Sequence, residues 1–477
     1  MRIGRADVLW NFAATFLRIT ASILLYPLIL RMMTPEKVGV WTIFLTITSL
    51  VTLLDFGFNP SFTRNITYVL SGVKSLKPKG FSAPEDHNES IDYGLLKGVV
   101  KSMQWFYSRI AILLFILLIT LGTYYIFTIL KTYKGDQTEV YIAWGILCVI
   151  TTYSLYTLYY DSLLQGSGMI KRSKQINIIG QLVYLLLASL LILAGFGLVA
   201  IVFSQASSVM IIRYLSYRSF FTAELKHNLH SAEARPRKEV LAAIYPNALK
   251  LGLTSLGGIL VSRSAIVIGS LYLTLENIAA YGISIHLIMV ISTLAATYIY
   301  TFQPKIAQLR VENNEEEIKK IYVKGALILF FVFALGGIGL VLTGEWVLRV
   351  IGSQTQLMPR VMVAVALLVY YLEMNHGVAG SILASKNEVP YFKAALVAGG
   401  ITVLLLLGFF KFTPMGLWAM IAAPGIAQGI YQNWKWPVTV AKELKISYRD
   451  IKNGVLAIIE IILTRIKVYK SFLQHTR

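Results

Sequence analysis

Runs of apolar residues, each about 20 residues long and separated by polar segments, dominate the chain. Runs of this length are typical of helices that cross a lipid bilayer, because the hydrocarbon core takes about 20 residues to span. The sequence predicts twelve such helices, near residues 8–30, 38–58, 109–130, 140–164, 176–195, 198–217, 244–273, 279–302, 324–343, 360–384, 391–410 and 416–440. The predicted fold class is therefore an all-α polytopic membrane protein.

The second half of the chain repeats features of the first. Thr34, Glu36, Gly39 and Trp41 follow the first apolar run, and Thr274, Glu276, Ala279 and Tyr281 follow the run at 244–273 with the same spacing. We expect two pseudo-symmetric six-helix lobes around a central cavity. The predicted division is an N-lobe at 1–217, a cytoplasmic basic linker at 218–243, a C-lobe at 244–440 and a cytoplasmic or interfacial tail at 441–477.

Charge sets the predicted orientation. The composition is 56% hydrophobic and 14% charged, with a formal net charge of +20. Of the 44 Lys and Arg, 35 lie in or beside segments on the side of the two termini, seven lie on the other side and two lie within spans. Positive residues concentrate on the cytoplasmic side of membrane proteins. We therefore expect both termini in the cytoplasm and the protein in the cell (inner) membrane, and the positive charge needs no nucleic-acid partner to explain it.

The first predicted helix carries a polar stripe. Asn11, Thr15, Arg18 and Ser22 share one helical face. Arg18 is about ten residues into the span, roughly 15 Å deep at 1.5 Å per residue. Charge at that depth marks a hydrated functional path in many membrane proteins. An arginine neutralised by an acidic neighbour to hold helices together is the structural alternative.

Further charged and aromatic residues lie in the other predicted spans. Lys250 and Arg263 lie in the seventh, where a charge costs at least about 2.5–3.5 kcal/mol near the centre. Tyr153 and Tyr156 share a face of the fourth helix, where they could stack on sugar rings or form an interfacial aromatic belt. Asp55 ends the second helix, either within a functional path or paired with Arg64 at the interface.

Two pairs of residues are candidates for ion coupling or metal binding. Glu373 and His376 lie close together in the tenth span, as a proton or Na⁺ site or as a structural hydrogen-bonded pair. We take these two residues and Asp161 as candidate ion-coupling groups. His227 and His230 form an H-x-x-H, but no other His or Cys and no clustered carboxylates lie near them in the sequence, so we expect no metal site.

Enzymatic motifs are absent from the sequence. It contains no P-loop, no G-x-S-x-G, no H-E-x-x-H and no C-x-x-C. Its one cysteine, Cys148, excludes an intramolecular disulfide. We expect neither catalysis nor a cofactor other than a coupling H⁺ or Na⁺.

The sequence resembles the polysaccharide flippases (Wzx-type, O-antigen and related exporters) of the multidrug/oligosaccharidyl-lipid/polysaccharide (MOP) transporter superfamily. The resemblance covers nearly the whole chain. It rests on degenerate motifs: Asn11…Arg18…Pro27…Arg31…Pro35-Glu36…Gly39…Trp41, then Asp55-Phe-Gly57 followed by Arg64, and Gln165-Gly166 before a basic turn.

The resemblance implies a function. It implies translocation of undecaprenyl-diphosphate-linked oligosaccharide repeat units from the cytoplasmic to the outer leaflet, by alternating access, for surface polysaccharide such as the O-antigen of lipopolysaccharide. Arg18 matches the position of a cationic substrate cavity, and Asn11, Lys250, Arg263, Tyr153 and Tyr156 are the other substrate-binding candidates. We expect a monomer whose partners are lipid-linked oligosaccharide, membrane lipid and other polysaccharide assembly proteins. The alternative is a cation-coupled small-molecule or drug exporter of the same superfamily.

Overall fold

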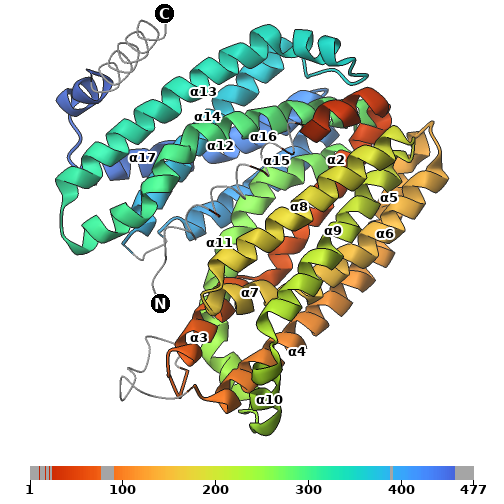
Figure 1. Ribbon diagram of the computed structural model, residues 1–477. Coiled ribbons are helices and arrows are strands. Elements are labelled where there is room, and N and C mark those ends of the chain that lie inside the picture. Colours follow the sequence, from red (N-terminus) through yellow and green to blue (C-terminus); the bar gives the residue numbers. More distant parts are fainter. Residues whose placement is uncertain are drawn as a thin grey trace, which may run out of the picture. The chain divides into compact units, whose positions relative to one another are not determined.

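The described part of the chain folds into helices joined by short loops (Figure 1). The computed structural model describes residues 24–76, 91–386 and 390–456, together with Trp10, Leu17 and Ala21. Contacts between residues divide the chain into two units. Unit 1 comprises 1–259, 266–280 and 348–356, and unit 2 comprises 260–265, 281–347 and 357–477.

Unit 1 contains the helices from α2 to α10 and most of α11. The sequence assigned residues from 244 onward to the second lobe, whereas α11 packs with unit 1 as far as Ile259. The bounds are α2 Pro35–Val51, α3 Phe58–Leu70, α4 Tyr93–Leu117, α5 Thr123–Ile129, α6 Gln137–Tyr156, α7 Tyr159–Gly166, α8 Ile170–Leu193, α9 Gly197–Phe220, α10 Ala223–Ser231 and α11 Arg237–Gly269.

Unit 2 contains the later helices. The first residues of α12, as far as Ala280, and the last residues of α13, from Leu348, belong to unit 1. The bounds are α12 Leu275–Val311, α13 Glu315–Ile351, α14 Arg360–Ala384, α15 Phe392–Phe412, α16 Leu417–Gly429 and α17 Gln432–Glu443.

Nine helical segments in the described residues are long and apolar enough to cross a membrane. They correspond to nine of the twelve predicted spans and run over Pro35–Asp55, Tyr93–Thr132, Gln137–Gly166, Ile170–Leu193, Gly197–Phe220, Leu275–Gln303, Glu315–Ile351, Arg360–Ala384 and Phe392–Phe412. The predicted span at 8–30 lies partly outside the described residues. The seventh, α11, has a shorter apolar stretch at Ser255–Gly269. The all-α, polytopic fold class is confirmed.

The twelfth predicted span, 416–440, is two helices in the structure. α16 ends at Gly429 and α17 begins at Gln432, with Tyr431 at a non-helical φ of −140° and ψ of −54° between them. The segment is rich in residues that weaken a continuous helix: Pro424 and Pro437 lie within the two helices. Hydropathy detects the apolar length of this segment and not its break.

A second irregularity lies in the span that begins with α4. Residues Leu118–Gly122 form a π-helical turn between α4 and α5. A Cβ on Gly122 would lie 2.7 Å from the Trp144 ring, so glycine permits α6 to approach here. The Trp144 indole N–H also donates to the Thr123 hydroxyl over 3.0 Å. The widened turn therefore coincides with the packing of a large aromatic side chain.

Glu139 joins the ends of three helices in unit 1 on the predicted outer side. Its carboxylate lies 2.6 Å from the Lys37 ammonium and accepts a hydrogen bond from the backbone N–H of Leu198 over 2.6 Å. Near it, burial raises the pKa of Tyr133 to about 12, and the negative charges of Glu139, Glu36 and Asp136 contribute to the same shift. The first turn of α9 has no side-chain cap of its own, so Glu139 of α6 supplies an acceptor to it.

The predicted linker at 218–243 is a folded part of unit 1. α10 begins at a Thr222 cap, and the Lys97 ammonium donates to the carbonyl oxygens of His230 and Ala232. Arg235 lies 3.3 Å from Asp92, and its backbone N–H donates to the Gly94 carbonyl. The segment is therefore fixed against the start of α4.

Glu443 joins the ends of three helices in unit 2. Its carboxylate lies 2.6 Å from the Arg310 guanidinium of α12 and 2.9 Å from the Lys386 ammonium that follows α14. Arg310 also donates to the Ser385 hydroxyl over 3.2 Å. One acid of α17 thus links the ends of α12 and α14.

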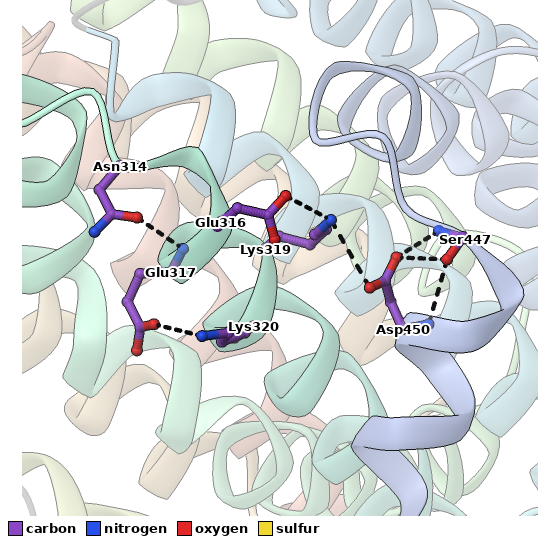
Figure 2. Close-up of polar contacts among 7 residues, drawn as sticks. All are labelled: Asn314, Glu316, Glu317, Lys319, Lys320, Ser447 and Asp450. Atoms are coloured by element: carbon purple, nitrogen blue, oxygen red, sulfur yellow. Dashed lines mark hydrogen bonds and ion pairs between the residues drawn. The ribbon is translucent and has the colours of Figure 1, made fainter.

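The tail begins a further helix at Tyr448, which lies along α13 (Figure 2). The Asp450 carboxylate accepts hydrogen bonds from the Ser447 backbone N–H and hydroxyl, each over 2.8 Å, and lies 3.8 Å from the Lys319 ammonium. A Cβ on Gly454 would lie 2.8 Å from Leu327 and 3.0 Å from Val323. The described tail, as far as residue 456, therefore contacts α13 at two successive helical turns.

Candidate functional site

Each unit contains a group of polar side chains on its helices. In unit 1 the group is Asp55, Asn59, Tyr107, Asp161 and Arg213, which we call the aspartate network. In unit 2 it is Arg263, Tyr281, Tyr370, Glu373 and Gln428, which we call the glutamate cluster.

The aspartate network starts at a sharp turn. The 3₁₀ turn Thr52–Asp55 extends α2, and then Phe56 (φ 45°) and Gly57 (φ 71°) adopt left-handed backbone conformations before α3 begins. Glycine accommodates this conformation without a Cβ penalty, but phenylalanine is strained in it. A Cβ on Gly252 of α11 would lie 2.7 Å from the Phe56 Cα atom. The turn is therefore held from outside by a close helix contact.

Asp55 is buried and fully engaged with the protein. Its carboxylate accepts a hydrogen bond from the Tyr107 hydroxyl over 2.6 Å, and its two oxygens lie 3.1 and 3.2 Å from the backbone N–H of Asn59. Asp55 is 8% exposed and Tyr107 is 0% exposed. The carboxylate therefore supplies an acceptor to the first turn of α3 and ties it to α4.

Asp161 has a different partner. One carboxylate oxygen lies 2.9 Å from Nη1 of Arg213, which is buried within α9. Both Asp161 and Arg213 act electrostatically on Tyr107, so this pair lies near the Tyr107–Asp55 hydrogen bond. The ion pair lacks hydrogen-bond geometry, and Nε and Nη1 of Arg213 have no hydrogen-bond partner in the described residues. Arg213, counted with the cytoplasmic residues in the sequence, is thus a buried arginine of a spanning helix.

The sequence left two alternatives for Asp55, a place within a functional path or a pairing with Arg64 at the interface, and the structure tests the second. Arg64 is exposed on α3 and is not a partner of Asp55 in the described contacts. Within the described residues, Asp55 and Arg64 therefore do not pair. No sequence signal indicated Tyr107 as the partner, because it lies 52 residues away in a different helix.

The glutamate cluster draws on four helices of unit 2. Tyr281 of α12 is buried, its hydroxyl donates to the Met420 carbonyl oxygen over 3.4 Å, and the side chain of Tyr370 of α14 is its neighbour. Both tyrosine hydroxyls lie in the electrostatic field of Glu373 and of Arg263. Gln428 of α16 interacts with the Glu373 carboxyl, and its Nε2 has no hydrogen bond of ordinary geometry in the described residues. The cluster thus contains one carboxyl group, one arginine cation and neutral hydrogen-bond donors.

His376 has a partner other than Glu373. Its Nδ1 lies 2.9 Å from Oδ1 of Asn433 in α17. The sequence paired His376 with Glu373 because they are three residues apart. In the described contacts neither is the hydrogen-bond partner of the other.

The substrate-binding candidates have different places in the structure. Asn11 and Arg18 lie outside the described residues, and Lys250 lies in α11 with its side chain outside the described part. Tyr153 and Tyr156 are 38% and 37% exposed and line an apolar groove between α4 and α6 in unit 1. Among the described residues, Arg263 is the one candidate of the six with several polar neighbours inside its unit. These neighbours are the other members of the glutamate cluster.

Several residues of the two groups were missed by sequence reasoning. They are Tyr107, Arg213 and Tyr281, whereas Tyr370, Gln428 and Asn433 are polar residues of the predicted tenth and twelfth spans whose partners the sequence did not indicate. Arg213 carried a usable signal, because it falls within the predicted span at 198–217. The others are polar residues without charge, and only the folded arrangement of helices brings them to a carboxylate or an imidazole.

Comparison with known proteins gives relatives at the level of the fold. A multidrug resistance MATE family transporter of the MOP superfamily, in an inward-facing conformation, matches with a TM-score of 0.63 and 14% identity over 90% of this chain and 94% of that one. The lipid II flippase MurJ, in an inward closed conformation, matches with a TM-score of 0.58 and 13% identity over 96% and 93%. The MATE multidrug transporter DinF-BH matches with a TM-score of 0.57 and 16% identity over 94% and 96%.

The comparisons do not extend to sequence families. No family model matches the chain. No curated protein matches it at the sequence level either. The chain therefore has the fold of the MOP superfamily transporters, as a multi-pass membrane protein whose structural neighbours are transporters and flippases.

Proposed function

We propose that this protein is a flippase that carries undecaprenyl-diphosphate-linked oligosaccharide from the cytoplasmic to the outer leaflet by alternating access. The observation that carries the proposal is the state of the two carboxylates of the aspartate network. Asp55 is occupied by the Tyr107 hydroxyl and the Asn59 N–H, and Asp161 is paired with Arg213. An exporter of cationic compounds needs a carboxylate that can pair with its substrate. A transporter of an anionic substrate does not need one.

The chemistry of the substrate agrees with the charge of the chain. A diphosphate and sugar headgroup cannot cross hydrocarbon without a hydrated, hydrogen-bonding path. Arginine suits such a path, because its planar fork binds phosphate oxygens in pairs and remains charged when desolvated. Arg18, Lys250 and Arg263 are the cations proposed for it. One structural neighbour is itself a lipid flippase, which supports transport of a lipid-linked substrate on this fold.

The first test is disruption of the gene. Lipid-linked repeat units should accumulate on the cytoplasmic side, and surface polysaccharide should be lost. Complementation with Arg18→Ala should fail, while Arg18→Lys should restore part of the export, because lysine keeps the charge and loses the bidentate fork. Normal polysaccharide in the disrupted strain, together with lower resistance to cationic dyes, would replace the flippase with a small-molecule exporter.

We further propose that Glu373 is the group that couples transport to H⁺ or Na⁺. It is the acid of the glutamate cluster, on the same helix as Tyr370, and the side chain of Gln428 is its hydrogen-bonding neighbour. Asp161 is the less suitable candidate, because its carboxylate already has a cationic partner in Arg213. His376 has a positioning role through Asn433 of α17.

The coupling proposal has its own measurement. Glu373→Gln should abolish the dependence of transport on pH or Na⁺, because the amide cannot exchange a proton or carry charge. Glu345→Gln is a matched control, since Glu345 pairs with Arg360 at the exposed ends of α13 and α14. Unchanged ion dependence in Glu373→Gln would place the coupling group elsewhere.

A further inference from the structure

A small pocket with two arginines lies between the ends of α8 and α9 in unit 1. Its cavity volume is about 420 Å³. The lining residues, which define what we call the two-arginine pocket, are Met169, Arg172, Tyr214, Leu215, Arg218 and Ser219. Neither transport nor ion coupling, as proposed above, uses any of them.

The pairing of the two helices explains why the arginines meet. The turn at Gly195–Gly197 makes α8 and α9 an antiparallel hairpin. A Cβ on Gly180 would lie 2.4 Å from Ile212, and the Ser208 hydroxyl donates to the Gly180 carbonyl over 2.7 Å. From the Gly180–Ser208 hydrogen bond, Arg172 lies about 12 Å back along α8 and Arg218 about 15 Å forward along α9, at 1.5 Å per residue. Both therefore arrive at the same end of the hairpin.

Both guanidinium groups are only partly used. Nε of Arg172 donates to the Ser219 hydroxyl over 3.1 Å, and Nη1 of Arg218 donates to the Tyr214 hydroxyl over 3.3 Å. Both side chains are exposed, and among the described residues no carboxylate pairs with either. Each guanidinium has five N–H donors, so most of its donors remain available. Two such groups beside one cavity form a binding site for an oxyanion.

The walls of the pocket indicate a ligand within the membrane. Met169, Tyr214 and Leu215 place apolar surface next to the arginines, and Tyr214 is 58% exposed. Outside the pocket lining, the Tyr217 and Phe221 rings near the same end of α9 lie with centroids 5.2 Å apart, and the Lys226 ammonium lies 5.0 Å from the Tyr217 ring. Tyrosine and arginine at the end of a spanning helix are typical of the level of the lipid headgroups.

We infer that the two-arginine pocket binds the phosphate of an anionic phospholipid in the leaflet on the predicted cytoplasmic side. The two guanidinium groups would hold the phosphate oxygens, Tyr214 and Ser219 would keep the guanidinium groups in place, and Met169 and Leu215 would contact the glycerol and upper acyl chain. The position is fixed on the hairpin of one unit, so the bound lipid would serve as a stable anchor of unit 1 rather than as cargo.

The test measures lipid binding by native mass spectrometry of the full-length protein in detergent. Dioleoylphosphatidylglycerol is the probe, and dioleoylphosphatidylcholine is the zwitterionic comparison. The double variant Arg172→Gln/Arg218→Gln should bind the anionic lipid roughly 25-fold more weakly, at about fivefold for each arginine near an anionic surface. Arg172→Lys/Arg218→Lys should retain intermediate binding, because it keeps the charge without the planar fork.

A matched control distinguishes lipid binding at the two-arginine pocket from attraction of the lipid to surface cations in general. Arg64→Gln/Lys101→Gln removes two exposed cations from the same unit, outside the pocket. Binding of the anionic lipid to this control should stay close to that of the unchanged protein. Equal losses in the two glutamine variants, or equal binding of both lipids, would overturn the inference.

A competition with inorganic phosphate distinguishes the two sources of the anion. Excess inorganic phosphate should leave the lipid bound, since it lacks the glycerol and acyl contacts. Full displacement by phosphate would show a site for soluble anions and overturn the lipid assignment. Because the measurement needs no transport, its failure would leave the proposed flippase activity untouched.

Discussion

At Asp55 a carboxylate ends a spanning segment and is satisfied by groups from other parts of unit 1. The Tyr107 hydroxyl and the Asn59 N–H are donors, and left-handed residues at 56 and 57 turn the backbone so that α3 can begin beside it. Sequence reasoning identified Asp55 as a residue that needs a partner. It could not identify the partner, because hydropathy and spacing carry no information on which helices become neighbours.

Removing the Tyr107 hydroxyl tests this hydrogen bond. Tyr107→Phe leaves a buried carboxylate without its side-chain donor, and we expect a loss of about 1–2 kcal/mol, between values typical of hydrogen bonds in membranes and those made to charged groups. Thermal unfolding in detergent measures the change. Tyr124→Phe is the control, since Tyr124 is 71% exposed on the continuation of the same span. Equal stability of the two variants would show that the Tyr107–Asp55 bond contributes nothing.

Asp450 gives a prediction with a defined pH direction. Hydrogen bonds from the Ser447 backbone N–H and hydroxyl hold the pKa of Asp450 below its ordinary value, and the Lys319 ammonium adds to the shift (Figure 2). A carboxylate with a lowered pKa stabilises the folded state above its unfolded pKa, and this contribution is lost as pH falls through the folded value. Amide exchange corrected for intrinsic rate should therefore rise in residues 448–456 on acidification. Asp450→Asn should show the raised exchange already at pH 7, and exchange that is independent of both changes would contradict the assignment.

At the scale of elements, apolar length was predicted well and interruptions poorly. Nine predicted spans have long apolar helices, yet the π-helical turn at Leu118–Gly122 and the break between α16 and α17 have no signal in hydropathy. Burial of apolar residues depends on their number, whereas an interruption depends on what packs against one turn. Trp144 beside Gly122 is such a local cause, and it became visible only with the fold.

The contact between the tail and α13 is a prediction at this scale. Gly454 faces the side chains of Val323 and Leu327 so closely that a branched side chain there forces these side chains or the tail to shift. Gly454→Val should therefore raise proteolytic cleavage within 448–456, while Asn453→Leu on the exposed side of the same helix should not. Equal cleavage of the two variants would show that the tail does not depend on this contact.

At the scale of the whole molecule, orientation is the property that the sequence predicts and the fold leaves untested. Three candidate spans, Gln137–Gly166, Ile170–Leu193 and Gly197–Phe220, separate Asp136 from Asn228. An odd number of crossings places these two residues on opposite sides of the membrane. The 35-to-7 distribution of Lys and Arg then decides which side is which, and it places Asn228 in the cytoplasm.

Reporter fusions check both steps of this topology. A fusion after Asn228, within α10, should report the cytoplasm, as should one at His87, which lies outside the described residues; a fusion after Asp136 should report the outside. If the Asn228 fusion reports the outside and the Asp136 fusion reports the cytoplasm, the charge argument is refuted and the predicted spans still stand. A shared compartment for Asn228 and Asp136 would mean that one of the three intervening helices does not cross. The two outcomes are distinguishable, because the first depends only on the distribution of Lys and Arg and the second only on the number of crossings. The cytoplasmic result would also place Arg172 and Arg218 in the leaflet where the two-arginine pocket requires them.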